Sequence, residues 1–494
     1  MLLYFFLIIP FLGSFLSFFS QKFGYNKPRL CAILTLFVNF LTLLFIYYKY
    51  FFSINLLIFP KIYWNLEYFT PWIQSLGISF HLALDNFSFL MIFFTLILGL
   101  CSVLLTWNNL EKNIGIFYCG LMSLIGSLIG VFLSVDLFLF FLFWELTIFL
   151  TYFLLIFYGN NKYSKKNRIF YANKFLIYSQ ISGFFLLISI LGLSINYFIY
   201  KHLWTFDYNV LKNFNYNNFN NFNFYFLMFG FIFSFLIKIP IVPFHSWLID
   251  FYKISPVSGS LDILGTLIKT SFYGIFRFNI VFFPELLQKF SIIFIIISIF
   301  SMFYSSFLAM KSNNAKKILA YGSISHMSLM FLSLYIGNFL SYQGVLLQIF
   351  ASSITFSALF IILGKIFNKF KKFNFLNISG LWKKIKYLPE FFIFFTISNV
   401  GLPSTGNFLG EFLILLGIYN NSWKILILVL CNLLFSFFYY LRVFHNICYG
   451  KKNIFFKKIN IYKKDFFMLL FFSILLIILG LFPKIFLFNI FNII

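Results

Sequence analysis

Charged residues are scarce in this sequence: 10% of its 494 residues are Asp, Glu, Lys or Arg, and only 12 of them are acidic. Soluble domains carry about 25% charged residues, so the composition excludes a soluble globular protein. Apolar residues make up 62% of the chain, and its mean hydropathy is +0.94. Long apolar runs of this kind are typical of a protein that crosses a membrane many times.

Cysteine is also scarce and widely spaced, at positions 31, 101, 119, 431 and 448, with no C-x-x-C pair. This spacing predicts neither a disulfide framework nor an iron–sulfur site. The sequence has no histidine cluster, no P-loop and no Gly-rich dinucleotide motif. We therefore expect no metal and no redox cofactor in this chain.

The first residues, 2–19, lack a basic segment and an A-x-A cleavage site, and they are not rich in Arg and Ser. They predict a first membrane span rather than a signal or transit peptide. The apolar runs predict an all-α polytopic membrane protein with about fourteen transmembrane helices. The expected helices cover residues 2–19, 30–48, 86–106, 114–134, 136–158, 173–199, 224–248, 257–280, 287–309, 318–337, 341–367, 388–417, 423–447 and 465–490.

Residues 49–85 separate the second and third spans and end in an alternating stretch, 78–85, which favours a short surface hairpin. The Asn-rich segment 213–223 is interpreted as an expanded loop.

The net charge of +25 has two explanations, nucleic-acid binding or the positive-inside rule of membrane proteins. Most Lys and Arg fall in the loops that follow odd-numbered helices, including 162–168 and 463–464, so the second explanation is favoured and no nucleic acid is expected. Phe is extreme at 84 residues and Tyr stands at 30, which suggests an AT-biased organelle genome. The prediction is a multi-pass protein of the mitochondrial inner membrane, with basic loops in the matrix and both termini on the intermembrane-space side.

Two long apolar runs are interrupted by Pro or Gly beside an ionisable group, at 235–245 and at 399–411. Proline removes a backbone donor, so the freed carbonyls need water or protein partners, which a polar cavity would supply. Broken helices at matching places point to inverted repeats. We expect two inverted five-helix repeats, helices 4–8 and 9–13, with helices 7 and 12 broken. The predicted divisions are 1–112 (three helices and hairpin), 113–282 (first repeat), 283–448 (second repeat) and 449–494 (last helix).

Four charges lie too deep in apolar runs to reach the membrane surface: Glu145, Lys238, Lys269 and Glu411. A charge at the bilayer centre costs roughly 2.5–3.5 kcal/mol, so each needs a function or a partner. We predict a proton relay, with Lys238 as switchable carrier and Glu145 as its modulator. Lys269 would relay laterally, and Glu411 would be the last group before the exit. The alternative is structural ion pairs that link helices.

Two histidines, His245 and His326, are candidate members of the relay, because histidine titrates near neutral pH. The alternative is that each donates a hydrogen bond between helices. The other histidines, at 81, 202 and 445, lie in or near loops and are not included. Asp262 lies seven residues before Lys269 on the same helical face, where a simple pairing is favoured over a relay role.

At these residues the sequence resembles the antiporter-like subunits of NADH-ubiquinone oxidoreductase, respiratory complex I, over nearly its whole length. Five stretches carry the resemblance: 136–146, 238–248, 256–260, 316–327 and 406–412. Within the family, Glu411 in place of Lys and the absence of a long C-terminal extension match the chain 4 type.

The resemblance implies a proton-translocating subunit of NADH:ubiquinone reductase in which this chain does no redox chemistry. Flavin, iron–sulfur clusters and ubiquinone are then expected in partner subunits. The expected partners are the chain 2 and chain 5 antiporter-like subunits, accessory subunits and membrane lipids such as cardiolipin. Two alternatives remain: a Mrp-type cation/proton antiporter subunit, which shares the fold and key charges, and a proton-inactive scaffold.

The sequence departs from the family pattern in the predicted helix 341–367. Family members usually have a His-Gly pair where this chain has Ser352 and Ser353. The central relay must then use water with a hydroxyl, or His326 alone. Tyr252 also stands where the family has a second His, and Asp262 where it has an apolar residue.

Overall fold

The computed structural model describes residues 1–50, 64–107, 113–160, 163–214, 221–256, 265–370, 379–383, 385–449 and 462–487. Helices and two strands follow one another in chain order as α1 Leu2–Ser20, η1 Gln21–Phe23, α2 Lys27–Tyr50, β1 Leu66–Ile73, η2 Gln74–Leu76, β2 Ile78–Leu84, α3 Asn86–Thr106, α4 Ile114–Leu133, α5 Leu137–Tyr158, α6 Lys165–Lys201, α7 Tyr208–Lys212, α8 Asn221–Lys238, α9 Ser246–Ile254, α11 Thr266–Gly274, the π-helix η4 Ile275–Asn279, α12 Ile280–Phe282, α13 Pro284–Lys311, α14 Ala315–Ile336, α15 Phe339–Phe370, η6 Leu381–Lys383, α16 Leu388–Ser398, α17 Gly406–Asn421, α18 Trp423–Cys448, α19 Lys463–Leu481 and α20 Pro483–Leu487.

Within the described residues, eleven helices are long and apolar enough to cross a membrane, and each coincides with a predicted span. Two of the three other predicted spans are interrupted: 224–248 corresponds to α8 with α9, and 388–417 to α16 with α17. The third, 257–280, is described from residue 265 on, where α11, the π-helix η4 and α12 follow one another without a gap. The prediction of an all-α polytopic membrane protein with breaks in helices 7 and 12 is confirmed. Residues 257–264, and with them Asp262, lie outside the described residues.

Some predicted helix bounds were wrong. The helix predicted over 173–199 begins earlier, at Lys165, because the Ser164 hydroxyl accepts a hydrogen bond from the Asn167 amide and caps the helix. The helix predicted over 465–490 ends at Leu481, and Pro483 begins the separate α20. Proline cannot continue a helix but is tolerated in its first turn.

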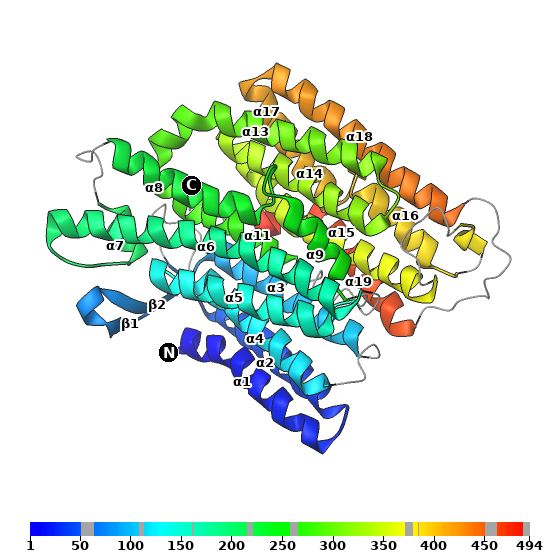
Figure 1. The fold of residues 1–494 in the computed structure, drawn as a ribbon, viewed down its shortest axis with the longest axis horizontal. Coiled ribbons are helices and arrows are strands. Elements are labelled where there is room, and N and C mark those ends of the chain that lie inside the picture. The colour runs from blue at the N-terminus through cyan, green and yellow to red at the C-terminus, as the bar shows by residue number, and fades with distance from the viewer. Residues whose placement is uncertain are drawn as a thin grey trace.

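The helices lie side by side with nearly parallel axes, with α1 and α2 at one edge of the bundle and α17 and α18 at the other (Figure 1). α4 packs on α5, α5 on α6, and α6 on α8, just as α13 packs on α14, α14 on α15, and α15 on α17. This recurrence of neighbours is that of two five-helix repeats. The exact divisions after residues 112, 282 and 448 stay predictions.

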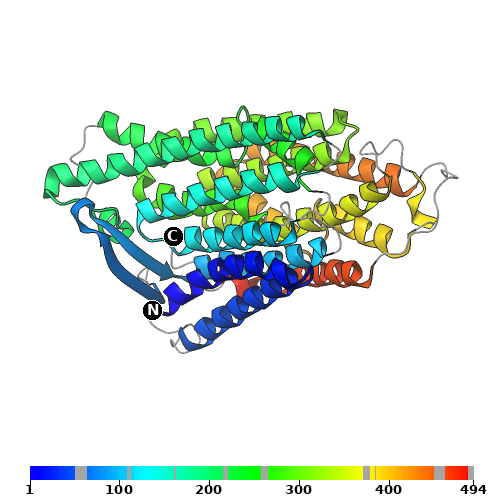
Figure 2. The ribbon, with the colours of Figure 1, turned by 60° about the horizontal axis from the view of Figure 1, so that its bottom comes forward.

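The predicted surface hairpin is confirmed: β1 and β2 pair antiparallel, with Leu66 opposite Leu84. Figure 2 shows the hairpin projecting from the end of the bundle where the N-terminus lies. The Tyr4 ring of α1 packs against the rings of Tyr68 and Phe80, so the start of the chain is attached to the hairpin. At the end of β2, Asp85 accepts a hydrogen bond from the Ser88 amide and begins α3.

Burial differs strongly between the helices. α1, α2 and α18 expose many large apolar side chains, as expected for helices that face lipid. By contrast, the most apolar 18-residue window of α15 is entirely buried. α15 packs against α14, α16, α17 and α19, so it lies at the centre of the second repeat.

Candidate functional site

The first broken helix ends at Lys238 and resumes at Ser246. Pro240, with a positive φ of 32°, turns the chain out of the helix. One freed carbonyl, that of Ile237, accepts a hydrogen bond of 2.9 Å from the indole Nε1 of Trp247. The break is thus satisfied in part by a protein side chain.

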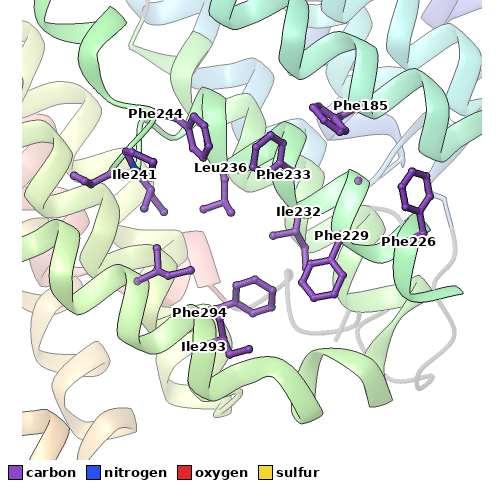
Figure 3. Close-up of a pocket in the computed structure, with 14 residues that line it drawn as sticks. Phe185, Phe226, Phe229, Ile232, Phe233, Leu236, Ile241, Phe244, Ile293 and Phe294 are labelled. Carbon is purple, nitrogen blue, oxygen red and sulfur yellow. The ribbon is translucent and has the colours of Figure 1, made fainter. Parts of the chain in front are cut away.

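On one side the first break borders an apolar pocket. A cavity of about 390 Å³ lies between α6, α8 and α13 and reaches the break, where Ile241, Val242 and Pro243 line it (Figure 3). Its other lining residues, among them Phe229 and Phe294, are also apolar. Three of the lining residues, Phe226, Phe229 and Ile293, are exposed on the outside of the bundle, so the pocket opens there and offers no polar side chain.

Lys238 is 1% exposed and its Nζ has no hydrogen-bond partner among the described residues. The ammonium lies over the indole ring of Trp144, 4.3 Å from the ring centroid. A desolvated cation–π contact of this kind contributes about 2 kcal/mol, less than the cost of burying an unpaired ammonium. The charge on Lys238 is therefore only partly compensated.

Glu145 follows Trp144 on α5, but its carboxylate does not pair with Lys238 in the described structure. Instead it accepts a hydrogen bond of 2.8 Å from Gln180 Nε2 on α6. The carboxylate lies directly against Gly183, where an added Cβ would stand 1.9 Å from Glu145 Oε1. Glu145 and Lys238 are brought to the same region and held apart, with Glu145 attached to the neighbouring helix.

Lys269 lies on α11 and is 3% exposed. Its Nζ donates three hydrogen bonds to α15: to Ile349 O at 2.6 Å, Ser352 Oγ at 2.6 Å and Ser353 Oγ at 2.8 Å. The serines that replace the family's His-Gly pair are therefore the residues that hold Lys269. This contact joins the first repeat to the second.

The second broken helix ends at Ser398 and resumes at Gly406, with positive φ at Gly401 (104°) and Ser404 (74°). The carbonyl of Ser398 accepts a hydrogen bond of 3.2 Å from the Gly401 amide and a second one of 3.0 Å from Asn407 Nδ2. A side chain beyond the break thus satisfies a carbonyl before it, as at the first broken helix.

Glu411 lies on α17 after this break and is 4% exposed. Its Oε1 accepts a hydrogen bond of 3.2 Å from Gln348 Nε2 and lies 3.5 Å from His326 Nδ1 on α14. Gly401 makes room for the other oxygen, since an added Cβ would stand 3.2 Å from Glu411 Oε2. The structure therefore brings the predicted residues Glu411 and His326 together.

His326 Nε2 has no hydrogen-bond partner among the described residues, although the ring packs against Phe356 and Tyr440. His245 begins α9, after the first break, and its ring meets the edge of Tyr304 on α13. Its Nδ1 has no partner in the part of the chain that the structure describes. Among the same residues, no hydrogen bond or ion pair joins His245 to the four predicted charges.

Two amides that the sequence did not single out, Gln180 and Gln348, bind the carboxylates of Glu145 and Glu411. Each lies within an apolar run, and that position is the signal that could have identified them. An uncharged amide costs less to bury than a charge, so it stands out less in a hydropathy pattern.

His81, which was left out of the predicted relay as a residue in or near a loop, lies within a strand. This side chain on β2 is buried, with Nδ1 against Asp207 and Nε2 2.6 Å from Glu67. Burial lowers the pKa of His81, but the hydrogen bonds and charges of Asp207 and Glu67 outweigh burial and raise the pKa above its ordinary value. Nearby, Arg277 of η4 pairs with Asp85 at 2.7 Å. The hairpin end of the bundle thus carries buried charges of its own.

Residues 134–436 match the family model described as NADH:quinone oxidoreductase/Mrp antiporter, TM. NADH-quinone oxidoreductase subunit M of Buchnera aphidicola subsp. Schizaphis graminum is 42% identical over 487 residues, which cover 98% of this chain and 96% of that relative. Subunit M of Escherichia coli K12 is 36% identical over 488 residues, which cover 98% of this chain and 95% of that one.

Two solved structures have the same fold. A chain of respiratory complex I from Thermus thermophilus with bound NADH gives a TM-score of 0.85 at 23% identity, covering 98% of this chain and 96% of that chain. A chain of the Mrp complex from Dietzia sp. DQ12-45-1b gives 0.83 at 17% identity, covering 100% of this chain and 52% of that chain. At these identities both similarities concern the fold.

Proposed function

The chain belongs to the NADH:quinone oxidoreductase/Mrp antiporter transmembrane family, and from this premise we propose that it is subunit M, the counterpart of chain 4, of a NADH-quinone oxidoreductase. In this role it is a proton-translocating subunit of the membrane arm of respiratory complex I. The observation that carries the proposal is a series of ionisable side chains that crosses the bundle from α5 to α17 beside both broken helices: Glu145 is half-buried, and Lys238, Lys269 and Glu411 are buried.

These side chains fall into three groups along the bundle. Glu145 and Lys238 form the first, Lys269 with Ser352 the second, and Glu411 with His326 the third. Burying isolated charges is costly, and groups that bind and release protons give a reason to retain them. In the proposed mechanism Lys238 takes up a proton and Glu145, when it approaches, favours the charged form.

The roles of the other residues follow from their positions. Lys269 is the lateral group that links the two repeats, and Glu411 is the last buried group before the exit. His326 contacts Glu411 and is placed to exchange a proton with it, whereas His245 stands at the first break and is assigned to the entry side. Water is needed wherever these groups are not in contact.

Electron transfer is assigned to other subunits. Moving one charge against the membrane potential costs about 2.3 kcal/mol per 100 mV, and this energy must come from quinone reduction by NADH. We propose that flavin, iron–sulfur clusters and ubiquinone are bound by partner subunits. The chain 2 and chain 5 antiporter-like subunits are the proposed neighbours in the membrane arm, with accessory subunits and lipids such as cardiolipin around them.

The membrane is proposed to be the cytoplasmic membrane of a bacterium, because the similar proteins come from bacteria. The mitochondrial inner membrane remains the alternative. It was predicted from the high Phe content, which reflects the base composition of the coding DNA and not the membrane in which the protein lies. In a bacterium, the basic loops would face the cytoplasm and both termini the periplasm.

The Mrp-type antiporter has less support. The Dietzia chain is 17% identical, whereas both subunit M relatives are at least 36% identical over nearly the whole chain. Purification of the tagged chain separates the two: flavin and iron–sulfur subunits that co-purify support the oxidoreductase. Rescue of growth in sodium without those subunits would support the antiporter.

The proposed function is tested with Lys238→Ala and Glu411→Gln in inverted membrane vesicles supplied with NADH and a quinone. We expect both variants to assemble but to lose NADH-driven proton uptake, measured with a pH-sensitive dye. Lys289→Ala and Glu390→Gln, which remove exposed charges, serve as matched controls and should pump normally. A normal ratio of protons to electrons in both test variants would contradict the proposal.

A further inference from the structure

Helix α15 contacts both of the charges that the relay needs in the middle of the bundle. Lys269 binds it at Ser352 and Ser353, and Glu411 binds it at Gln348. Gln348 and Ser352 are four residues apart, which is about one helical turn, or roughly 6 Å along the axis. A positive and a negative group are thus attached to the same rigid, buried helix at neighbouring turns.

The hydrogen bonds at Lys269 have a defined direction. An ammonium has three donors and no acceptor, and here it meets three acceptors: one carbonyl and two hydroxyls. Each hydroxyl also donates its own proton to α15, Ser352 to the carbonyl of Gln348 and Ser353 to that of Ile349. The serine lone pairs therefore point to Lys269, and both hydroxyls are engaged as acceptors from the ammonium.

Gln348 binds the second charge, Glu411, as the two serines bind Lys269. It is fully buried, and its Nε2 donates to Glu411 Oε1. The space for its side chain comes from Gly410, where an added Cβ would stand 2.8 Å from Gln348 Oε1. An amide neither gains nor loses a proton near neutral pH, so Gln348 orients the carboxylate without carrying a proton itself.

We propose that Ser352, Ser353 and Gln348 are positioning residues that hold Lys269 and Glu411 at a fixed separation on α15. The two charges are coupled through the electric field along this helix, and no side chain between them on α15 carries the proton. The inference rests on the proposed function. It gives α15, which carries Ser352 and Ser353, a specific role. It also explains how the relay works with serine where the family has histidine.

The proposal is tested with two double variants. They differ from each other by two hydroxyl groups at nearly constant side-chain shape. Ser352→Thr with Ser353→Thr keeps both acceptors, whereas Ser352→Val with Ser353→Val removes them. We expect proton uptake per electron close to normal in the Thr variant. The rate should fall about tenfold in the Val variant, the factor expected for loss of hydrogen bonds to a charged group. Ser323→Val on α14, a buried hydroxyl that bonds the Ala320 carbonyl, is the packing control.

A second comparison keeps the test informative if the β-branched variants do not assemble. Gln348→Met removes the amide and Gln348→Glu places a second carboxyl beside Glu411. We expect Gln348→Glu to move the pH profile of proton uptake, because it adds a titrating group next to Glu411, and Gln348→Met to lower the rate without adding a titration. Identical pH profiles in these two variants would overturn the proposal. So would equal rates in the Thr and Val variants.

The Lys238→Ala variant, measured in parallel, separates the inference from the function it rests on. If Lys238→Ala pumps normally, the proposed function itself fails. If Lys238→Ala is impaired while the Thr and Val variants do not differ, the function stands and only the role of α15 is wrong.

Discussion

Among the described residues, Lys238 stands at the end of one broken helix with no hydrogen-bond partner, whereas Glu411 beside the other accepts a hydrogen bond from Gln348 on α15 and lies 3.5 Å from His326 on α14. The Lys238 ammonium is stabilised by the face of the Trp144 ring. The Glu145 carboxylate lies in the same region but is hydrogen-bonded to Gln180. A buried charge without a hydrogen-bond partner is costly to keep, whereas a carboxylate that accepts a hydrogen bond is held in one orientation. The comparison teaches that two similar helix breaks can leave one ionisable side chain without a hydrogen bond and orient the other.

The largest expected effect is on the free energy of unfolding when Lys238 or Glu411 is replaced by an uncharged residue. Lys238→Met should stabilise the protein, because it removes a buried ammonium that lacks a partner. Glu411→Leu should destabilise it by about 1–3 kcal/mol for each group left unsatisfied, namely Gln348 and His326. Unfolding can be followed by thiol labelling of Cys448, which is buried, after the other cysteines are replaced by alanine. Equal destabilisation by both variants would remove the distinction between the two breaks.

The next effect tests the position of Glu145. Gly183→Ala would place a Cβ 1.9 Å from Glu145 Oε1 and must displace the carboxylate. We expect proton uptake to fall on the order of 10–100-fold, the cost of misplacing a reacting group by about 1 Å. Gly192→Ala is the matched control on the same helix, because its Cβ would displace only the tip of Leu227. If both variants pump alike, the position of Glu145 is not important for pumping.

A smaller effect concerns the carbonyls freed at the breaks. Trp247→Phe keeps an aromatic ring but removes the donor to Ile237 O, and Asn407→Leu removes the donor to Ser398 O. Each should lower stability by about 1 kcal/mol, the net value of one hydrogen bond. The Cys448 labelling assay measures both. No change in either variant would mean that the breaks are satisfied by other groups.

The smallest effect lies outside both broken helices, at His81. The raised pKa of His81 means that its contribution to stability is complete below the ordinary value of about 6.5 and is lost as pH rises through the raised value. The groups that face the ring are Glu67 and Asp207, and Asp207 also forms a β-bridge with Asp136. We expect protease cleavage of the hairpin in the wild type to increase with pH over the interval above the ordinary histidine pKa of about 6.5, since the raised pKa of His81 lies above that value.

In His81→Gln the same cleavage should not depend on pH over this interval, because glutamine does not titrate. Proton uptake at neutral pH should be normal, since His81 lies apart from the broken helices. A pH-dependent cleavage that persists in His81→Gln would show that another group controls the hairpin.

Much of the fold could be predicted from local sequence. Apolar runs of about 20 residues identify spans because lipid forces the backbone to satisfy itself within a helix. Pro240 and Gly401 marked the two breaks for the same reason, since each interrupts an otherwise continuous run. The alternation at 78–85 was sufficient for the hairpin. Helix ends were less well predicted, because caps such as Ser164 act through single hydrogen bonds.

The candidate site was predicted only in part. Charges are conspicuous in an apolar sequence, so Glu145, Lys238, Lys269 and Glu411 were found at once. Their partners were not, because Gln180 and Gln348 are neutral and lie far along the chain from the carboxylates they bind. His81 was left out for a similar reason: Asp207, which contacts it, is 126 residues away in sequence.

By itself the sequence determined that this chain crosses a membrane many times, where two of its helices break and which charges lie deep in apolar runs, because each depends on the cost of placing a residue in lipid. Only the tertiary structure decided, among the described residues, which of these charges has hydrogen-bond partners and which has none. Partners come from other helices, and packing alone brings Ser352 to Lys269 and Gln348 to Glu411 while it leaves Lys238 facing a ring. No spacing along a single helix contains that information.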